Sequence, residues 1–285
     1  MSVKYENPPV IYAVAKISFN DSIGSFSNEK YLSLRDEIES QGFEAYTKSS
    51  MMGVQVQHSS NEFNAKPSNI DRIGYFTAER DKAIVIDENS VELRVSRYTN
   101  HSDFLDCFTT VLDKCFNLGI AKGNKQRELD LHYVDIFAPI QGANLGDMLK
   151  NVSLPNHQFY RDETDSICLG SLNFIRVLES GRQKVEVNLE HINLKNIEGK
   201  KYLPESLSEP DPKLGMPLEP TRLFKDFSGE EYAIAHTNCS SLLDENTDVV
   251  DIRQKLEEMY KESRKTFDYM VNRDVCDGIW SIIGD

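Results

Sequence analysis

The sequence predicts an α+β fold, in which two pseudo-repeated β-α-β(3-4)-α units form one large antiparallel sheet packed on one face by two long helices. Three observations predict it. Runs in which apolar residues alternate with polar ones indicate strands in both halves. A long amphipathic pattern of helical period closes each half. The order of elements is also the same in both halves of the 285 residues, although the halves share no obvious residue identity.

Residues 1–120 form the first predicted half. Ile11 to Phe19 alternates as a strand that is covered on one side, and a helix follows from about Glu29 to Gln41, with Gly42 as its stop. Four short strands then predict an antiparallel meander: Met51–Gln57, Ile70–Ala78, Lys82–Asp87 and Val91–Tyr98. The half closes with the helix from Ser102, its expected N-cap, to Leu118.

Residues 121–285 form the second half, which begins with the longest strand pattern, Arg127–Pro139. A proline-rich insertion at 195–219 reads as irregular structure, and we expect one continuous domain. The remaining elements are predicted in this order: a short helix over about 145–151, strands over about 166–179, 184–194 and 230–239, and a helix over 248–271.

The charge balance narrows the kinds of partner. The chain has 32 Lys and Arg against 46 Asp and Glu, a net charge of -14, and both halves are acidic. Such a surface repels phosphate backbones and anionic membranes, so nucleic acid is an unlikely partner and no membrane partner is expected. We find no signal peptide and no apolar run long enough to cross a bilayer. The five scattered cysteines fit reduced thiols in a cytoplasmic protein that needs no metal or cofactor.

Two resemblances accompany this pattern. The segments NPPVIYAVAKISF, GYFTAERDKAIVIDENSVELRVSRY, RELDLHYVDIF and KTFDYMVNRDVCDGIW resemble a sporadically distributed bacterial family of uncharacterised function. Members typically carry Arg-Tyr-(Ile/Val)-Asn in the central strand, where this chain has His132 and Asp135 in place of Arg and Asn. The patchy distribution of the family implies cargo of a defence or toxin-antitoxin locus. The order of elements is also similar to the duplicated saddle of TATA-box-binding-like proteins, which concerns the fold alone.

The central strand contains the most suggestive chemistry. Glu128, Asp130 and His132 are spaced two apart and therefore share one face. A histidine beside carboxylates could act as a general base or as half of a metal site. A site would also need a group from a distant segment, such as His191 or His236. Alternation alone equally predicts a solvated polar face, and we favour that interpretation.

Other candidates have simple structural explanations. Arg94 and Arg97, near His101, could bind an anion, but they point to opposite faces of a strand. Cys107 and Cys115 fit core thiols, and the acidic run 162–165 fits a solvated loop rather than a calcium loop. Trp280 either packs back onto the sheet, which we favour, or forms an exposed anchor for another protein.

We therefore predict a cytoplasmic binding or regulatory protein that acts through a protein partner, with basic partners favoured and a homo-oligomer possible. The open face of the sheet would be the binding surface, with Arg94, Arg97 and Trp280 as possible contacts. Two alternatives stay open. One is a metal-assisted hydrolase or nucleotide-processing enzyme that uses His132, Asp130 and Glu128. The other is a small-ligand binder with a pocket between sheet and helices.

Overall fold

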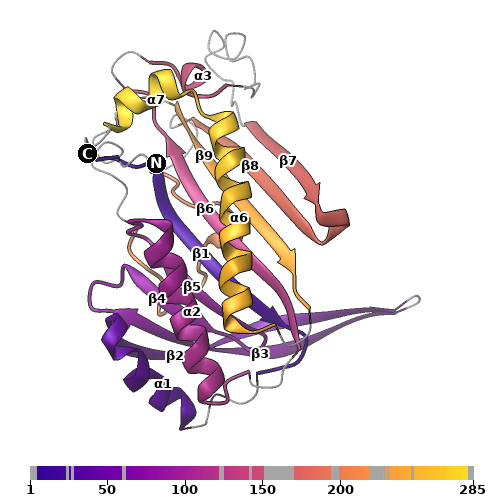
Figure 1. Ribbon diagram of the computed structural model, residues 1–285. Coiled ribbons are helices and arrows are strands. Elements are labelled where there is room, and N and C mark those ends of the chain that lie inside the picture. Colours follow the sequence, from indigo (N-terminus) through magenta and orange to yellow (C-terminus); the bar gives the residue numbers. More distant parts are fainter. Residues whose placement is uncertain are drawn as a thin grey trace.

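A nine-stranded antiparallel sheet with the strand order β2-β3-β4-β5-β1-β6-β9-β8-β7 is the frame of the molecule (Figure 1). Long helices pack against one face of this sheet, so the predicted fold class is confirmed. The computed structural model describes residues 5–23, 26, 29–59, 62–121, 125–140, 143–150, 170–193, 199–218, 227, 229, 231–244 and 247–281.

The elements follow the predicted order. The strands are β1 (Val10–Phe19), β2 (Phe43–Ser59), β3 (Glu62–Thr77), β4 (Lys82–Ile86), β5 (Ser90–Val95), β6 (Gln126–Phe137), β7 (Gly170–Leu178), β8 (Gln183–Asn193) and β9 (Glu231–Leu242). The helices are α1 (Lys30–Ile38), α2 (His101–Asn117), α3 (Leu145–Met148), α6 (Val249–Met270) and α7 (Arg273–Trp280). Short 3-10 turns are η1 (Glu39–Gln41), η2 (Glu179–Gly181) and η4 (Glu205–Leu207).

The two halves meet at the centre of the sheet. The first strand of each half, β1 and β6, pair antiparallel, with Ala15 opposite Leu131. On the outer side of each lies the last strand of the same half, β5 beside β1 and β9 beside β6. The long helices that follow these last strands, α2 and α6, contact one another. The duplication predicted from element order is therefore present as two similar units in one continuous sheet.

The main core lies between the sheet and the long helices. Leu129, Leu131 and Tyr133 of β6 point to this side, because they alternate with Glu128, Asp130 and His132 along the strand. The buried positions of α2 include Phe104, Phe108, Val111 and Cys115, the predicted apolar stripe. The helix begins two residues earlier than predicted, because the side chain of Asn100 accepts the hydrogen bond from the Asp103 amide. Asn100, and not Ser102, is thus the N-cap.

The opposite face of the sheet, called here the second face, is partly covered. Residues 199–218 of the proline-rich insertion, called here the strap, cross this face. Leu214 of the strap is fully buried against Phe76 and Val85 of the first half. Other strap residues, Leu207 and Met216 among them, pack near β1 and β6. The strap therefore covers part of the sheet face that we expected to be open for binding, because it buries apolar surface there.

The β2–β3 hairpin and the helix α7 differ from the prediction. The β2–β3 hairpin is far longer than the segments Met51–Gln57 and Ile70–Ala78, and its end projects beyond the rest of the sheet (Figure 1). The mostly polar segments 47–50 and 64–69 lack the alternation of apolar and polar residues by which strands were predicted. The C-terminal helix α7 was not predicted. The start of the strand expected from Ser166, the end of the helix expected to reach 151, and the acidic run 162–165 lie outside the described residues.

Candidate functional site

A polar cavity of about 420 Å³ lies between the strap and the centre of the second face. Its floor is formed by Val14 and Lys16 of β1 and by Asp130 and His132 of β6. Alternation along both strands directs these side chains away from the helices. Residues 206–210 of the strap form part of its wall. Two of the three residues that we predicted for an enzyme, Asp130 and His132, thus line one cavity, whereas Glu128 is not among its lining residues.

His132 is paired with a histidine from the second half. Its Nδ1 lies 3.1 Å from Nε2 of His236 on β9, and the two rings are stacked. Burial, followed by the proximity of His236 and Lys16, lowers the pKa of His132 to about 3. Burial also lowers the pKa of His236. Both imidazoles are therefore neutral at pH 7, and one ring donates the shared hydrogen bond to the other.

The other predicted histidine lies apart from this pair. His191 of β8 is 2% exposed, and its Nε2 lies 3.4 Å from a carboxylate oxygen of Glu231. Within the described parts of the chain, no group of three His, Cys, Asp or Glu side chains could hold a metal ion. The structure thus brings one of the two proposed distant histidines to His132 and leaves the other elsewhere.

Asp130 and Lys16 stand directly opposite one another on β6 and β1. Burial, followed by the nearby charge of Glu128, raises the pKa of Asp130 to about 6. Neither side chain forms an ion pair with any residue that the structure describes. The cavity floor therefore presents one ammonium group and one carboxyl group that form no ion pair among the described residues, although Lys16, Lys184 and Arg127 attract the Asp130 carboxylate at longer range.

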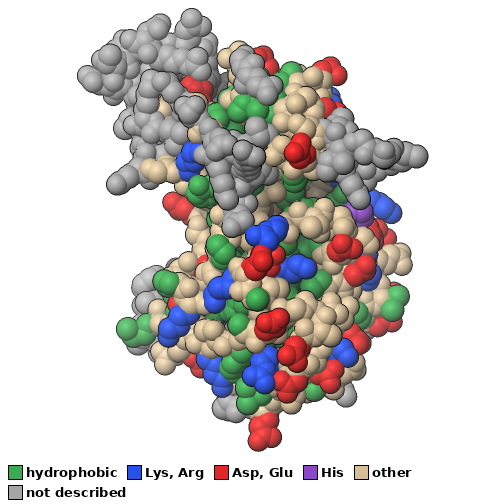
Figure 2. Space-filling model, turned by 90° about the vertical axis from the view of Figure 1, so that its left-hand side faces the viewer, with side chains coloured by type: hydrophobic (Ala, Val, Ile, Leu, Met, Phe, Trp, Pro, Cys, Tyr) green, Lys and Arg blue, Asp and Glu red, His purple; other side chains and the backbone are tan. Residues whose placement is uncertain are grey.

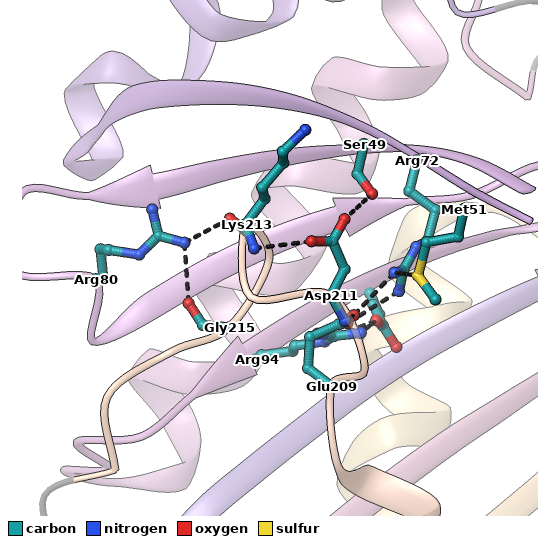
Figure 3. Close-up of polar contacts among 10 residues, drawn as sticks. Ser49, Met51, Arg72, Arg80, Arg94, Glu209, Asp211, Lys213 and Gly215 are labelled. Carbon is teal, nitrogen blue, oxygen red and sulfur yellow. Dashed lines mark hydrogen bonds and ion pairs between the residues drawn. The ribbon is translucent and has the colours of Figure 1, made fainter.

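Arg94, a predicted contact residue, instead fastens the strap (Figure 3). Its guanidinium donates to Glu92 on the same strand and, at 2.7 Å, to Glu209 of the strap. Arg72 of β3 donates two further hydrogen bonds to the same Glu209 carboxylate, at 2.8 and 2.9 Å. Burial alone would raise the pKa of Glu209, but the hydrogen bonds from Arg72 and Arg94 outweigh it and hold the pKa below its ordinary value.

Further contacts hold the next turn of the strap in place. Asp211 accepts a short hydrogen bond from Ser49 of β2. The Arg80 guanidinium donates to the carbonyl oxygens of Lys213 and Gly215, at 2.7 and 2.9 Å (Figure 3). It also lies over the ring of Phe76. The strap is thus attached to three separate parts of the first half, and it gives the cavity a fixed wall.

The remaining predicted residues are dispersed. Arg97 follows the end of β5, is half exposed and pairs with Glu79. His101 stacks on Tyr260 of α6. Trp280 is 3% exposed and packs among Tyr5, Phe137 and Phe267, so it offers no exposed anchor. Cys107 and Cys115 are buried core thiols, and burial raises the pKa of both.

One edge of the sheet has an unusual surface. The terminal strand β7 exposes three large apolar side chains, Phe174, Ile175 and Val177, at 42, 59 and 66%. The sequence predicted only a strand here, and the sheet order shows that β7 is an edge. The cavity likewise depends on the strap, whose approach to β5 and β6 no local spacing reveals.

No family model matches the sequence, and no curated protein matches it either. Among the described helices, none is long and apolar enough to cross a bilayer.

Proposed function

We propose that this protein is a binding or regulatory protein whose partner is another protein, and that the partner adds a strand to the outer edge of β7. The observation that carries the proposal is the group of three exposed apolar side chains on that one terminal strand, Phe174, Ile175 and Val177. An exposed apolar edge strand offers a row of backbone donors and acceptors beside an apolar surface, which is the arrangement used in strand addition.

Within the part of the chain that the structure describes, the edge of β7 has few of the usual protections against such pairing. It contains no proline, and its register with β8 runs without a bulge from Gly170 to Leu178. Its one charged side chain, Arg176, is held by Glu262 and Thr266 of α6. The other terminal strand, β2, has a register irregularity near Phe43 and carries charged residues. Features of this kind discourage edge pairing, and they are present at one end of the sheet only.

Charge indicates the kind of strand that would pair. The net charge of the whole chain is -14. The side of the molecule in Figure 2 shows acidic and basic side chains interspersed with small hydrophobic patches, and no continuous basic area. A partner segment with alternating apolar and basic residues would therefore be attracted by the overall field and would cover Ile175 and Val177. A second acidic copy of this chain would be repelled.

The test compares the wild-type chain with a variant that carries Ile175→Lys and Val177→Lys. Lysine on an edge strand opposes pairing, and here it would also repel a basic partner. The control is Val250→Lys, at an apolar side chain of α6 that is 76% exposed. Partners captured by the wild-type chain and by the control, but not by the edge variant, are purified. Amide hydrogen exchange of the reconstituted complex is then measured.

Protection of the β7 amides in the complex would support the proposal. A partner that binds all three proteins equally, or one that protects other strands, would overturn it. Self-association of the wild-type chain that the edge substitutions abolish, measured by analytical ultracentrifugation, would replace the partner by a second copy.

The approach of His132 to His236 bears on the alternative of a metal-assisted hydrolase. The pair supplies two neutral imidazoles, and Asp130 lies two residues from His132 on the same face. The described side chains provide no third ligand in a suitable arrangement, so we build no reaction on the pair.

A further inference from the structure

We propose that the cavity under the strap binds a small zwitterion of the α-amino acid type, with the ligand carboxylate on Lys16 and the ligand ammonium on Asp130. This site goes beyond the proposed partner surface, because it lies at the centre of the second face and β7 is at the edge of the sheet. Its volume of about 420 Å³ is in the range of small-molecule pockets.

Charge pairing within the cavity determines which groups are available to a ligand. Arg72 and Arg94 line the wall, but both guanidinium groups are already bonded to Glu209, and Arg94 is also bonded to Glu92. Asp87, also on the wall, accepts a hydrogen bond from the Asn89 amide. These interactions occupy both guanidinium groups of the wall, whereas the hydrogen bond to Asp87 comes from a neutral amide and does not neutralise that carboxyl group.

The floor of the cavity contains both an ammonium group and a carboxyl group. Lys16 and Asp130 face one another across β1 and β6, but no ion pair joins them. An ammonium group beside a carboxyl group, neither of them in an ion pair with a described residue, matches a molecule that carries the opposite charges a few bonds apart. A simple anion would meet Asp130, and a simple cation would meet Lys16. A zwitterion satisfies both groups at once.

The surroundings strengthen this preference. His132 stays neutral, since burial and its histidine partner lower its pKa, and it therefore adds a hydrogen-bonding group without adding charge. Burial of the Asp130 carboxyl group raises its pKa to about 6, so a ligand ammonium would stabilise the ionised form. Tyr12 and Val14 add an aromatic ring and an apolar side chain to the cavity lining, where a small side chain of the ligand could pack.

The test is isothermal titration of the purified full-length chain with each of the twenty L-α-amino acids. We expect at least one of them to bind. Lys16→Gln and Asp130→Asn should each weaken its binding by about tenfold or more. The matched control is Lys261→Gln, at an exposed lysine of α6 outside the cavity lining, which should leave the affinity within about twofold. Circular dichroism would establish that each variant is folded, and Lys16→Arg keeps the charge if Lys16→Gln does not fold.

Modified ligands assign the two contacts separately. The N-acetyl derivative of the bound amino acid should bind weakly and equally to the wild-type chain and to Asp130→Asn. The derivative with an amide in place of the carboxylate should likewise bind weakly and equally to the wild-type chain and to Lys16→Gln. The proposal is overturned if the folded wild-type chain binds none of the twenty amino acids at millimolar concentration. It is also overturned if an amino acid binds with an affinity that neither floor substitution changes.

Discussion

Glu209 of the strap lies 2.7 Å from Nη1 of Arg94, although the two residues are 115 positions apart in the sequence. The same carboxylate also receives both hydrogen bonds from Arg72. The side chains of all three residues are only 9 to 13% exposed. This one carboxylate therefore joins the strap to two strands of the first half and fixes the wall of the central cavity.

Replacing that carboxylate should loosen the strap. We expect Glu209→Gln to lower the free energy of unfolding by about 2–4 kcal/mol, because it leaves the partly buried Arg72 guanidinium without its anion and removes one of the two carboxylates that Arg94 contacts. Urea denaturation followed by circular dichroism measures the change. Glu205→Gln, at an exposed position of the same strap, is the control and should be within about 0.5 kcal/mol of the wild type. Equal stabilities for the two variants would show that the ion pairs do not hold the strap.

Gly74 of β3 provides a second test of strap packing. A Cβ atom at this position would lie 2.7 Å from Leu214 Cδ2 and 2.7 Å from the ring of Phe76. We expect Gly74→Ala to cost about 1–3 kcal/mol, since the strap or the ring must move. Gly146→Ala is the matched control, because a Cβ atom there meets nothing within 4 Å. Thermal unfolding of both variants gives the comparison, and a neutral Gly74→Ala would mean that Leu214 shifts without cost.

Asp135 should make stability depend on pH. This residue of β6 is 6% exposed, and burial raises its pKa to about 7, although Arg264 and Arg273 act in the opposite direction. Between about pH 4 and pH 7 the folded chain binds more protons at this carboxyl than the unfolded chain does. The free energy of unfolding therefore falls as pH rises through that range, because the buried carboxyl group loses its proton and the folded chain becomes less stable.

Asp135→Asn removes this dependence. At pH 8 the variant should be more stable than the wild type by about 1–3 kcal/mol, and at pH 4.5 the difference should largely vanish. Urea midpoints at several pH values measure it, with Asp274→Asn, at an exposed carboxylate of α7, as the control. A variant that is less stable at pH 8 would show that Arg264 and Arg273 stabilise the ionised carboxylate more than burial opposes it.

The N-cap of α2 can be tested directly. The side chain of Asn100 accepts a hydrogen bond from the Asp103 amide at 2.9 Å, whereas the Ser102 hydroxyl contacts only the Asp106 side chain. Asn100→Ala should therefore lower the free energy of unfolding by about 1 kcal/mol, and Ser102→Ala should change it by less than about 0.5 kcal/mol. The opposite ranking in chemical denaturation would restore Ser102 as the cap.

The sequence was informative where a local pattern determines the structure. The stripe from Phe104 to Cys115 and the start of the last helix at Asp248 follow from helical period and capping, and both are present. Alternation along β6 correctly separated Leu131 from His132. The duplicated order of elements was sufficient to predict a continuous antiparallel sheet, because consecutive antiparallel strands pair with near neighbours.

The site was harder to predict, because it depends on contacts between segments far apart in the chain. His236, the partner of His132, is 104 positions away in the sequence, and Glu209, the partner of Arg72, is 137 positions away. Nothing in the spacing of Glu209 or Lys16 distinguishes them from solvated charges. Their roles follow only from the strap crossing the second face, and an irregular proline-rich segment has no periodicity that predicts its path.

The order in which the strands pair has a consequence for biosynthesis. The central strand β1 is made first, but one of its edges is complete only when β6 has emerged from the ribosome, and β6 in turn awaits β9 at Glu231–Leu242. Most of the chain must therefore be translated before the middle of the sheet is closed. Such a high contact order slows folding and leaves aggregation-prone edges exposed on the nascent chain. Chaperones that bind β1 and β6 during translation would shield the two strands on which the whole sheet depends.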